Sequence, residues 1–204
     1  ISGGPTVDNT NNIVIESGEG HDVVEIDQGV NMFGPGATTE TTGSSEIEIK
    51  IDTGSGRDQL FIRGHNRYSD NISITAGLVN LNGDDDGDVA IANLEWLGLH
   101  GQGGRDNINL INWTNDQTEA IGLSHIIIDG GKDGDNLRNG PLTGVVMLGG
   151  EDDDILRGNV HSELILGGNG NDRILGRGGN DRIYGESGSD FIRIGNTTLT
   201  TQQN

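Results

Sequence analysis

The chain of 204 residues contains no cysteine, which excludes disulfide bonds and thiolate metal sites. Aromatic residues make up only 3% of it and hydrophobic residues 31%, too few for a conventional globular core at this length. No run approaches the roughly 18 apolar residues of a membrane-spanning helix, so we expect no membrane insertion. No segment shows sustained helical periodicity, which predicts almost no helix.

Basic residues are also scarce, with 12 against 32 acidic residues and a formal net charge of −20. This balance argues against nucleic acid and anionic membrane surfaces as partners, because both require a basic face. Repulsion between like charges and the 36 glycines both disfavour a compact state. An ordered chain of this composition therefore needs a positive component that the sequence itself does not contain.

The C-terminal part of the chain repeats with a period of nine residues. Residues 149–193 divide into the five units GGEDDDILR, GNVHSELIL, GGNGNDRIL, GRGGNDRIY and GESGSDFIR. Nine residues fit neither the helical period of 3.6 nor the strand period of 2, but they fit a turn followed by a short strand. Every unit has an aliphatic residue in the eighth place and an acidic residue in the sixth, which is Asp154, Glu163, Asp172, Asp181 or Asp190.

Turns of the same type recur upstream at irregular spacing. The sixth place is acidic in SGEGHD, TGSGRD, GQGGRD and GGKDGD, at Asp22, Asp58, Asp106 and Asp135, and a weaker candidate places Asp88 there. Alternating aliphatic residues flank these turns, which is typical of strands with one buried face. The pattern predicts an all-β fold, a right-handed parallel β-roll or β-helix solenoid in which strands alternate with Gly- and Asp-rich turns.

The regularity of the repeats suggests an organisation along the chain. We expect a regular β-roll over residues 130–195 and a degenerate solenoid with longer strands over residues 1–129, followed by a tail at 196–204. The long spacings predict inserted loops at 32–45 and 64–70. One continuous solenoid domain is the alternative. Because the chain begins at Ile1, without an initiator Met or a leader, we expect it to be a piece of a longer protein.

The turns have the chemistry of a calcium site. Glycines let the backbone direct its carbonyl groups toward one point, an aspartate adds a carboxylate, and Ca²⁺ takes six to eight such oxygen ligands. One turn is too small for that, so we expect each ion to lie between two stacked turns, and five to seven ions would cancel half or more of the charge. The candidate ligand residues are Asp22, Asp58, Asp106, Asp135, Asp152, Asp154, Asp172, Asp181, Asp190, Gly150, Gly168, Gly170 and Gly179.

Two nine-residue units complete one circuit of such a solenoid, so alternate turns share an edge. Asp154, Asp172 and Asp190 are expected to line one edge, with Glu163 and Asp181 on the opposite one. The upstream turns are expected to extend the first edge, through Asp22, Asp58, Asp106 and Asp135.

The units of residues 167–193 closely resemble the hemolysin-type, or RTX, calcium-binding nonapeptide repeat, GGxGxDxUx with U a large aliphatic residue. The resemblance implies a parallel β-roll with Ca²⁺ in its turns. It also implies a bacterial protein that is exported unfolded by a type I system and folds outside the cell. Two units depart from the pattern, since Glu163 replaces the aspartate in one and Val145 holds the acidic place in GPLTGVVML, from Gly140. We expect those turns to bind weakly or not at all.

No general base, nucleophile or cationic residue beside a calcium turn stands out, so we expect no catalysis. The favoured role is a calcium-folded structural or adhesive module of a larger secreted or cell-surface bacterial protein, such as a surface layer, matrix, adhesin or filament. The expected partners are calcium ions, further copies or neighbouring modules, and cell-surface polysaccharide. The alternative is the carrier segment of a type I-secreted toxin or hydrolase whose active domain lies outside this chain.

Overall fold

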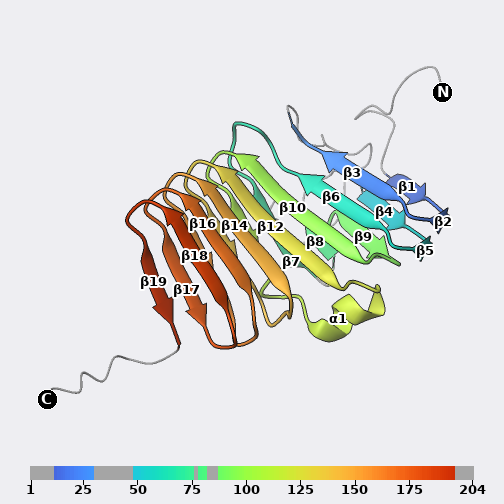
Figure 1. Ribbon diagram of the computed structural model, residues 1–204. Coiled ribbons are helices and arrows are strands. Elements are labelled where there is room, and N and C mark those ends of the chain that lie inside the picture. Colours follow the sequence, from blue (N-terminus) through green and yellow to red (C-terminus); the bar gives the residue numbers. More distant parts are fainter. Residues whose placement is uncertain (1–11, 30–47, 76–77, 82–86, 196–204) are drawn as a thin grey trace, which may run out of the picture.

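The chain coils into a stack of rungs, and the strands of successive rungs pair to form two facing β-sheets (Figure 1). The computed structural model describes residues 12–29, 48–75, 78–81 and 87–195. The predicted loop at 32–45 and the tail at 196–204 lie outside the described residues, as do residues 82–86 before Asp88. The alternating apolar residues of the sequence make these strands because each has one face against the interior.

A ten-stranded sheet forms one layer of the stack. Its strands, in spatial order, are β1 (Asn12–Glu16), β4 (Glu48–Asp52), β9 (Val89–Ala92), β8 (Leu78–Asn80), β7 (Asn71–Thr75), β11 (Asn107–Asn109), β13 (Asn136–Arg138), β15 (Ile155–Arg157), β17 (Arg173–Arg177) and β19 (Phe191–Ile194).

A seven-stranded sheet forms the other layer. Its order is β18 (Arg182–Ser187), β16 (Leu164–Asn169), β14 (Val145–Glu151), β12 (His125–Lys132), β10 (Trp96–Gly103), β6 (Gln59–Arg63) and β3 (Val23–Asp27). A small parallel pair joins β2 (Glu19–Gly20) to β5 (Ser55–Gly56). β12 spans both sides of the domain boundary predicted at residue 129 and pairs with a strand on each side.

The core is a single layer of aliphatic side chains between the sheets. The eighth-place residues pair in register across the ten-stranded sheet, so that Leu137, Leu156 and Ile174 form one buried row. Met147 and Ile165 face them from the seven-stranded sheet and are also fully buried. Nearly all strand pairs are parallel, which confirms the predicted all-β parallel β-roll.

One rung departs from the regular coil. β7, β8 and β9 are neighbours in the ten-stranded sheet, with β8 antiparallel to both of the others. In the facing sheet, β6 and β10 pair directly, without any inserted strand. The rung therefore widens only one of the two sheets.

A short helix, α1 (Asn115–Ala120), interrupts the strands between β11 and β12. Thr114 is its N-cap and forms a capping box with Gln117, a local signal that is too short to appear as helical periodicity. The expectation of almost no helix is otherwise met. In the part of the chain that the structure describes, no helix has the length and apolarity needed to cross a membrane.

The turns between the sheets gather on two opposite edges. Those leading from the seven-stranded to the ten-stranded sheet contain Asp70, Asp106, Asp135, Asp154, Asp172 and Asp190, and we call this the Asp154 edge. Those leading back contain Asp22, Asp58, Glu95, Glu163 and Asp181, and we call this the Glu163 edge.

Candidate calcium centre

The aspartates of the Asp154 edge form a continuous hydrogen-bonded ladder. The backbone N–H of each one donates to the Oδ1 atom of the aspartate one rung further along the stack. The donor–acceptor distances are 2.7 Å from Asp70 to Asp106, 2.7 Å from Asp106 to Asp135, 2.7 Å from Asp135 to Asp154, 2.9 Å from Asp154 to Asp172 and 3.0 Å from Asp172 to Asp190. The ladder fixes one carboxylate oxygen in each turn from Asp106 to Asp190.

Positive backbone φ angles explain why glycines recur in the turns. In the turns of residues 149–154, 167–172 and 185–190, the second and fourth places have positive φ, as they do at Gly168 (111°) and Gly170 (144°). Gly150 (123°) and Gly179 (97°) fill equivalent places in their own turns. Glycine adopts this conformation without the clash that a Cβ atom would cause.

Asp152 occupies a fourth place with φ of 77°, which aspartate tolerates better than most residues. Its side chain is exposed and takes no part in the ladder. Its carbonyl oxygen lies beside the next turn of the stack, since a methyl group added at Gly170 would lie 2.1 Å from it. The charge of its carboxylate also contributes to the raised pKa of Asp154.

The second carboxylate oxygen of each inner ladder residue is buried and has no hydrogen-bond partner in the described residues. This holds for the Oδ2 atoms of Asp106, Asp135, Asp154 and Asp172. All four side chains are at most 2% exposed. Burying an unpaired carboxylate oxygen is costly, so a row of four points to a missing positive partner.

Main-chain carbonyl oxygens converge beside the same Oδ2 atoms. A methyl group added at Gly149 would lie 2.4 Å from Asp154 Oδ2 and 2.3 Å from the carbonyl oxygen of Gly167, one rung on. The first glycines of three more turns show the same arrangement, which relates Gly101 to Asp106, Gly130 to Asp135 and Gly167 to Asp172. In the described residues no three His, Asp or Glu side chains converge, so a cation here would rely on carbonyl oxygens as well. Mixed hard oxygen donors fit Ca²⁺.

The ladder also shifts the acidity of its members. Burial, reinforced by the charges of neighbouring aspartates, raises the pKa of Asp106 to about 7, that of Asp135 to about 8 and that of Asp154 to about 7. Burial raises the pKa of Asp172 in the same way. Without a cation, these carboxyl groups therefore retain protons near neutral pH.

A pH dependence follows from these shifts. Because folding raises the pKa values from the ordinary 3.8 to about 7 or 8, the folded calcium-free chain binds protons that the unfolded chain has released. Its stability is therefore highest in acid and is lost as the pH rises through about 7 to 8. We expect calcium-free protein to gain β-sheet circular dichroism on acidification to about pH 5, and its calcium affinity to fall over the same interval, since protons compete with the ion. Loss of β-sheet signal on acidification would contradict this account.

The first-place glycines provide a second test. In Gly149→Ala, the new methyl group would collide with the oxygens around Asp154, so we expect a loss of about 1–3 kcal/mol in stability and of one bound ion. Gly144→Ala is the matched control. Gly144 has φ of 70° and nothing within 4 Å of an added methyl group, so backbone strain alone should destabilise this variant and leave the ion count unchanged. Equal ion counts in both variants, measured by equilibrium dialysis, would argue against a cation beside Gly149.

The Glu163 edge corrects one prediction. Asp22 and Asp58 were expected beside Asp154, but they lie on the opposite edge, because their turns lead from the ten-stranded to the seven-stranded sheet. There Asp22 N–H donates to Asp58 Oδ1 at 2.8 Å, and Asp58 N–H donates to Glu95 Oε2 at 2.7 Å. Within the described part of the chain, the Oδ2 atoms of both aspartates are buried without a hydrogen-bond partner, as on the Asp154 edge. In this second, shorter ladder, a cation would therefore also stabilise the buried carboxylates.

At Glu163, protein groups already donate hydrogen bonds to both carboxylate oxygens. Its Oε1 accepts a hydrogen bond from the Asn139 side chain at 3.0 Å, and its Oε2 accepts one from the Asn159 backbone at 3.4 Å. Asn139 directly precedes GPLTGVVML, the unit in which Val145 takes the acidic place, and lies in the turn from β13 to β14. Burial still raises the pKa of Glu163 to about 7. The protein contacts support the expectation that this turn binds calcium weakly or not at all.

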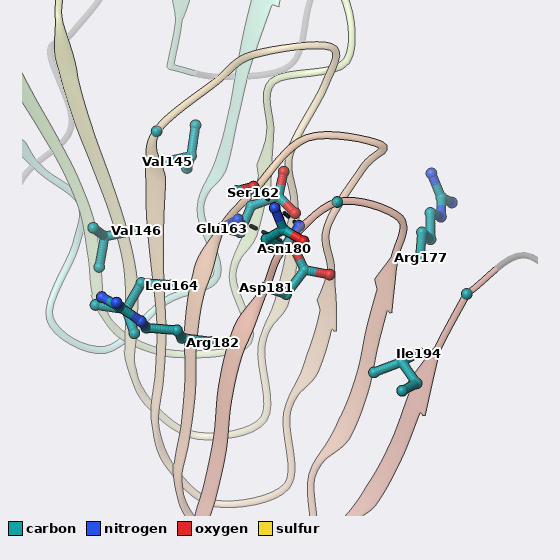
Figure 2. A pocket seen from close by; sticks show the side chains of 13 residues that line it. Val145, Val146, Ser162, Glu163, Leu164, Arg177, Asn180, Asp181, Arg182 and Ile194 are labelled. Atoms are coloured by element: carbon teal, nitrogen blue, oxygen red, sulfur yellow. Dashed lines mark hydrogen bonds between the residues drawn. The ribbon is translucent and has the colours of Figure 1, made fainter.

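Beyond Glu163 the edge opens into a hollow of about 1120 Å³. Figure 2 shows Ser162, Glu163, Asn180 and Asp181 gathered within it, with Arg177 to one side. Glu163 N–H donates to Asp181 Oδ1 at 3.1 Å, and Asn180 N–H donates to Ser162 Oγ at 3.0 Å. Asp181 thus continues the ladder pattern at the C-terminal end of this edge.

Two ladder residues escaped the sequence prediction. Asp70 lies in segment 64–70, expected as an inserted loop, which forms the turn from β6 to β7. Its Oδ2 accepts a bond from the His65 backbone at 2.6 Å, so it differs from the inner ladder residues. The triplet Asp70-Asn71-Ile72 matches Asp106-Asn107-Ile108, and this signal could have found it. Glu95 has no such signal, because its turn carries none of the glycine pattern.

Stacked turns with buried carboxylates and convergent carbonyls define a calcium-binding β-roll module. Residues 146–173 and 158–192 match the sequence profile of the RTX calcium-binding nonapeptide repeat, in four copies. The segment 146–192 is therefore made of RTX calcium-binding repeats, as its resemblance implied. No curated protein and no solved structure matches the chain.

Proposed function

We propose that this chain is an extracellular module that folds when calcium binds and gives rigid structure or adhesion to a larger secreted or cell-surface bacterial protein. The observation that carries the proposal is the ladder on the Asp154 edge. In the described residues, the second carboxylate oxygens of Asp106, Asp135, Asp154 and Asp172 are buried without a hydrogen-bond partner, and calcium would supply the missing charge. Sites that form only in the folded chain make ion binding contribute directly to folding.

Extracellular calcium suits such a site. Calcium modules outside cells commonly bind with dissociation constants of about 10⁻⁴–10⁻³ M, so that the ion concentration itself controls folding. The type I export implied by the RTX resemblance is consistent with this arrangement, because the chain would remain unfolded where calcium is scarce. We propose localisation outside the cell on these grounds.

The proposed role is structural and not catalytic. The ladder carboxylates are held by backbone hydrogen bonds and point into the stack, so they are poorly placed to reach a substrate. The alternative role, as carrier segment for a secreted toxin or hydrolase, is favoured by the regular repeats at 146–192. The full gene separates the two, because an adjoining catalytic or pore-forming domain would favour the carrier and many tandem modules would favour the structural role.

The number of bound ions tests the proposal directly. Equilibrium dialysis of the folded chain at millimolar calcium should give about five to seven ions per molecule, since each ion lies between two successive turns. A count below three would contradict ladders that bind calcium on both edges.

A further inference from the structure

The outer face of the ten-stranded sheet, from β13 to β19, carries a cluster of arginines in an otherwise acidic chain. Arg138 and Arg157 are directly paired in the register of β13 and β15. Arg173 lies on the next strand, beside Ile155, and Arg193 follows on β19. We define Arg138, Arg157, Arg173 and Arg193 as the arginine face. Like charges on adjacent strands are unfavourable unless something neutralises them.

The protein does not supply that neutralisation for the first three arginines. In the described residues, Arg138, Arg157 and Arg173 form no ion pair with a carboxylate. Among the residues that the structure describes, the buried Nε atom of Arg138 has no hydrogen-bond partner, and the Arg157 side chain donates to the neutral Asn136 side chain. Burial and the charges of Arg138, Arg177 and Arg173 lower the pKa of Arg157.

No acidic residue interrupts this face. The outward positions of the strands from β11 to β19 flank the buried aliphatic residues, and none of them is Asp or Glu. The apolar residues between the arginines are Ile155, Leu175 and Phe191, and Arg173 packs over the Phe191 ring at 4.9 Å. The face therefore alternates guanidinium groups with apolar patches.

From these features we propose that the arginine face binds an acidic polysaccharide. Guanidinium groups match carboxylate and sulfate oxygens through paired hydrogen bonds, and the apolar side chains fit the C–H faces of sugar rings. This inference deepens the proposed adhesive role and rests on the calcium-folded state.

The dimensions of the face favour a single thin polymer over nucleic acid. β13 and β15 have three residues each, which gives a flat strip only about 10 Å wide. Exposed carboxylates of Asp133, Asp152 and Asp153 stand along the Asp154 edge of the strip. These carboxylates would repel a broad polyanion such as a DNA duplex, whereas a single polysaccharide strand would fit on the strip between the two edges.

The test is binding of the calcium-loaded chain to dextran sulfate, with neutral dextran of equal length as the reference probe. The wild-type protein should bind only dextran sulfate, and Arg138→Gln/Arg157→Gln should bind about tenfold more weakly or worse. The control is Arg57→Gln/Arg67→Gln, which removes the same charge from exposed turns away from the face and should bind like the wild type.

Three results would overturn the inference, namely equal losses in the two double variants, no preference for dextran sulfate over dextran, or tighter binding to a DNA duplex. Circular dichroism of every variant in calcium separates this failure from failure of the proposed function. A chain that folds with calcium but does not bind the polymer would refute only the polysaccharide inference. A chain that does not fold with calcium would refute the proposed function itself.

Discussion

In excess chelator, the isolated chain is expected to lose nearly all of its β-sheet circular dichroism and to recover it when calcium is restored. The reason lies in the charge of −20 and in the single-layer core, which together leave little to hold the rungs once the ions are gone. Far-ultraviolet circular dichroism during a calcium titration measures the transition, and the steepness of the curve reports how many sites fill together.

Monovalent salt is the control for this experiment. Sodium chloride at matched ionic strength screens the repulsion between carboxylates without coordinating them, so it should restore little of the fold. Magnesium should also substitute poorly, because it demands a compact octahedral shell and gives up its water reluctantly. A β-sheet spectrum that persists unchanged in chelator, or that salt alone restores, would refute calcium-dependent folding.

Asp154→Asn is expected to raise the calcium concentration at the folding midpoint by about two- to eightfold. Asp154 is fully buried and accepts the Asp135 N–H through Oδ1, while its own N–H donates to Asp172. It therefore faces a turn on each side, and loss of its negative charge weakens two neighbouring ion positions at about 1.5–3 kcal/mol each. The size of asparagine matches that of aspartate, so packing should be preserved.

Two variants calibrate this result. Asp190→Asn removes a carboxylate at the end of the described ladder, where only the Asp172 N–H donates to it, so its effect should be about half as large in free energy. Asp116→Asn removes the same charge from the exposed first turn of α1, away from both ladders, and should leave the midpoint nearly unchanged. If Asp154→Asn shifted the midpoint no more than Asp116→Asn, stacking of ions along the edge would be wrong.

The strands and the regular turns could be predicted from the sequence because they depend on residue preferences at positions close together in the chain. A buried eighth place favours an aliphatic residue and a turn position with positive φ favours glycine, and both preferences leave a periodic pattern in the sequence. The same reasoning identified Asp106, Asp135, Asp154 and Asp172, whose buried Oδ2 atoms now indicate where a cation would lie.

The assignment of turns to edges failed because it depends on counting half-circuits. Between β6 and β10 the chain makes the three strands β7, β8 and β9 where a regular circuit has one, and spacing alone does not show whether such an insertion keeps or reverses the edge. Asp70 was missed because its turn is one residue longer than the repeat. The amide contacts of Asn139 with Glu163 join residues 24 positions apart, and no local pattern encodes them.

The uneven spacing of the ladder has a consequence for the order in which the rungs form. Its partners are separated by 36 residues from Asp70 to Asp106, then by 29, 19, 18 and finally 18 residues at Asp190. Closing a loop half as long saves about 0.6 kcal/mol of chain entropy, and local contacts also form faster. Nucleation should therefore begin among the short C-terminal circuits, and each completed rung then offers a template edge on which the longer N-terminal circuits assemble.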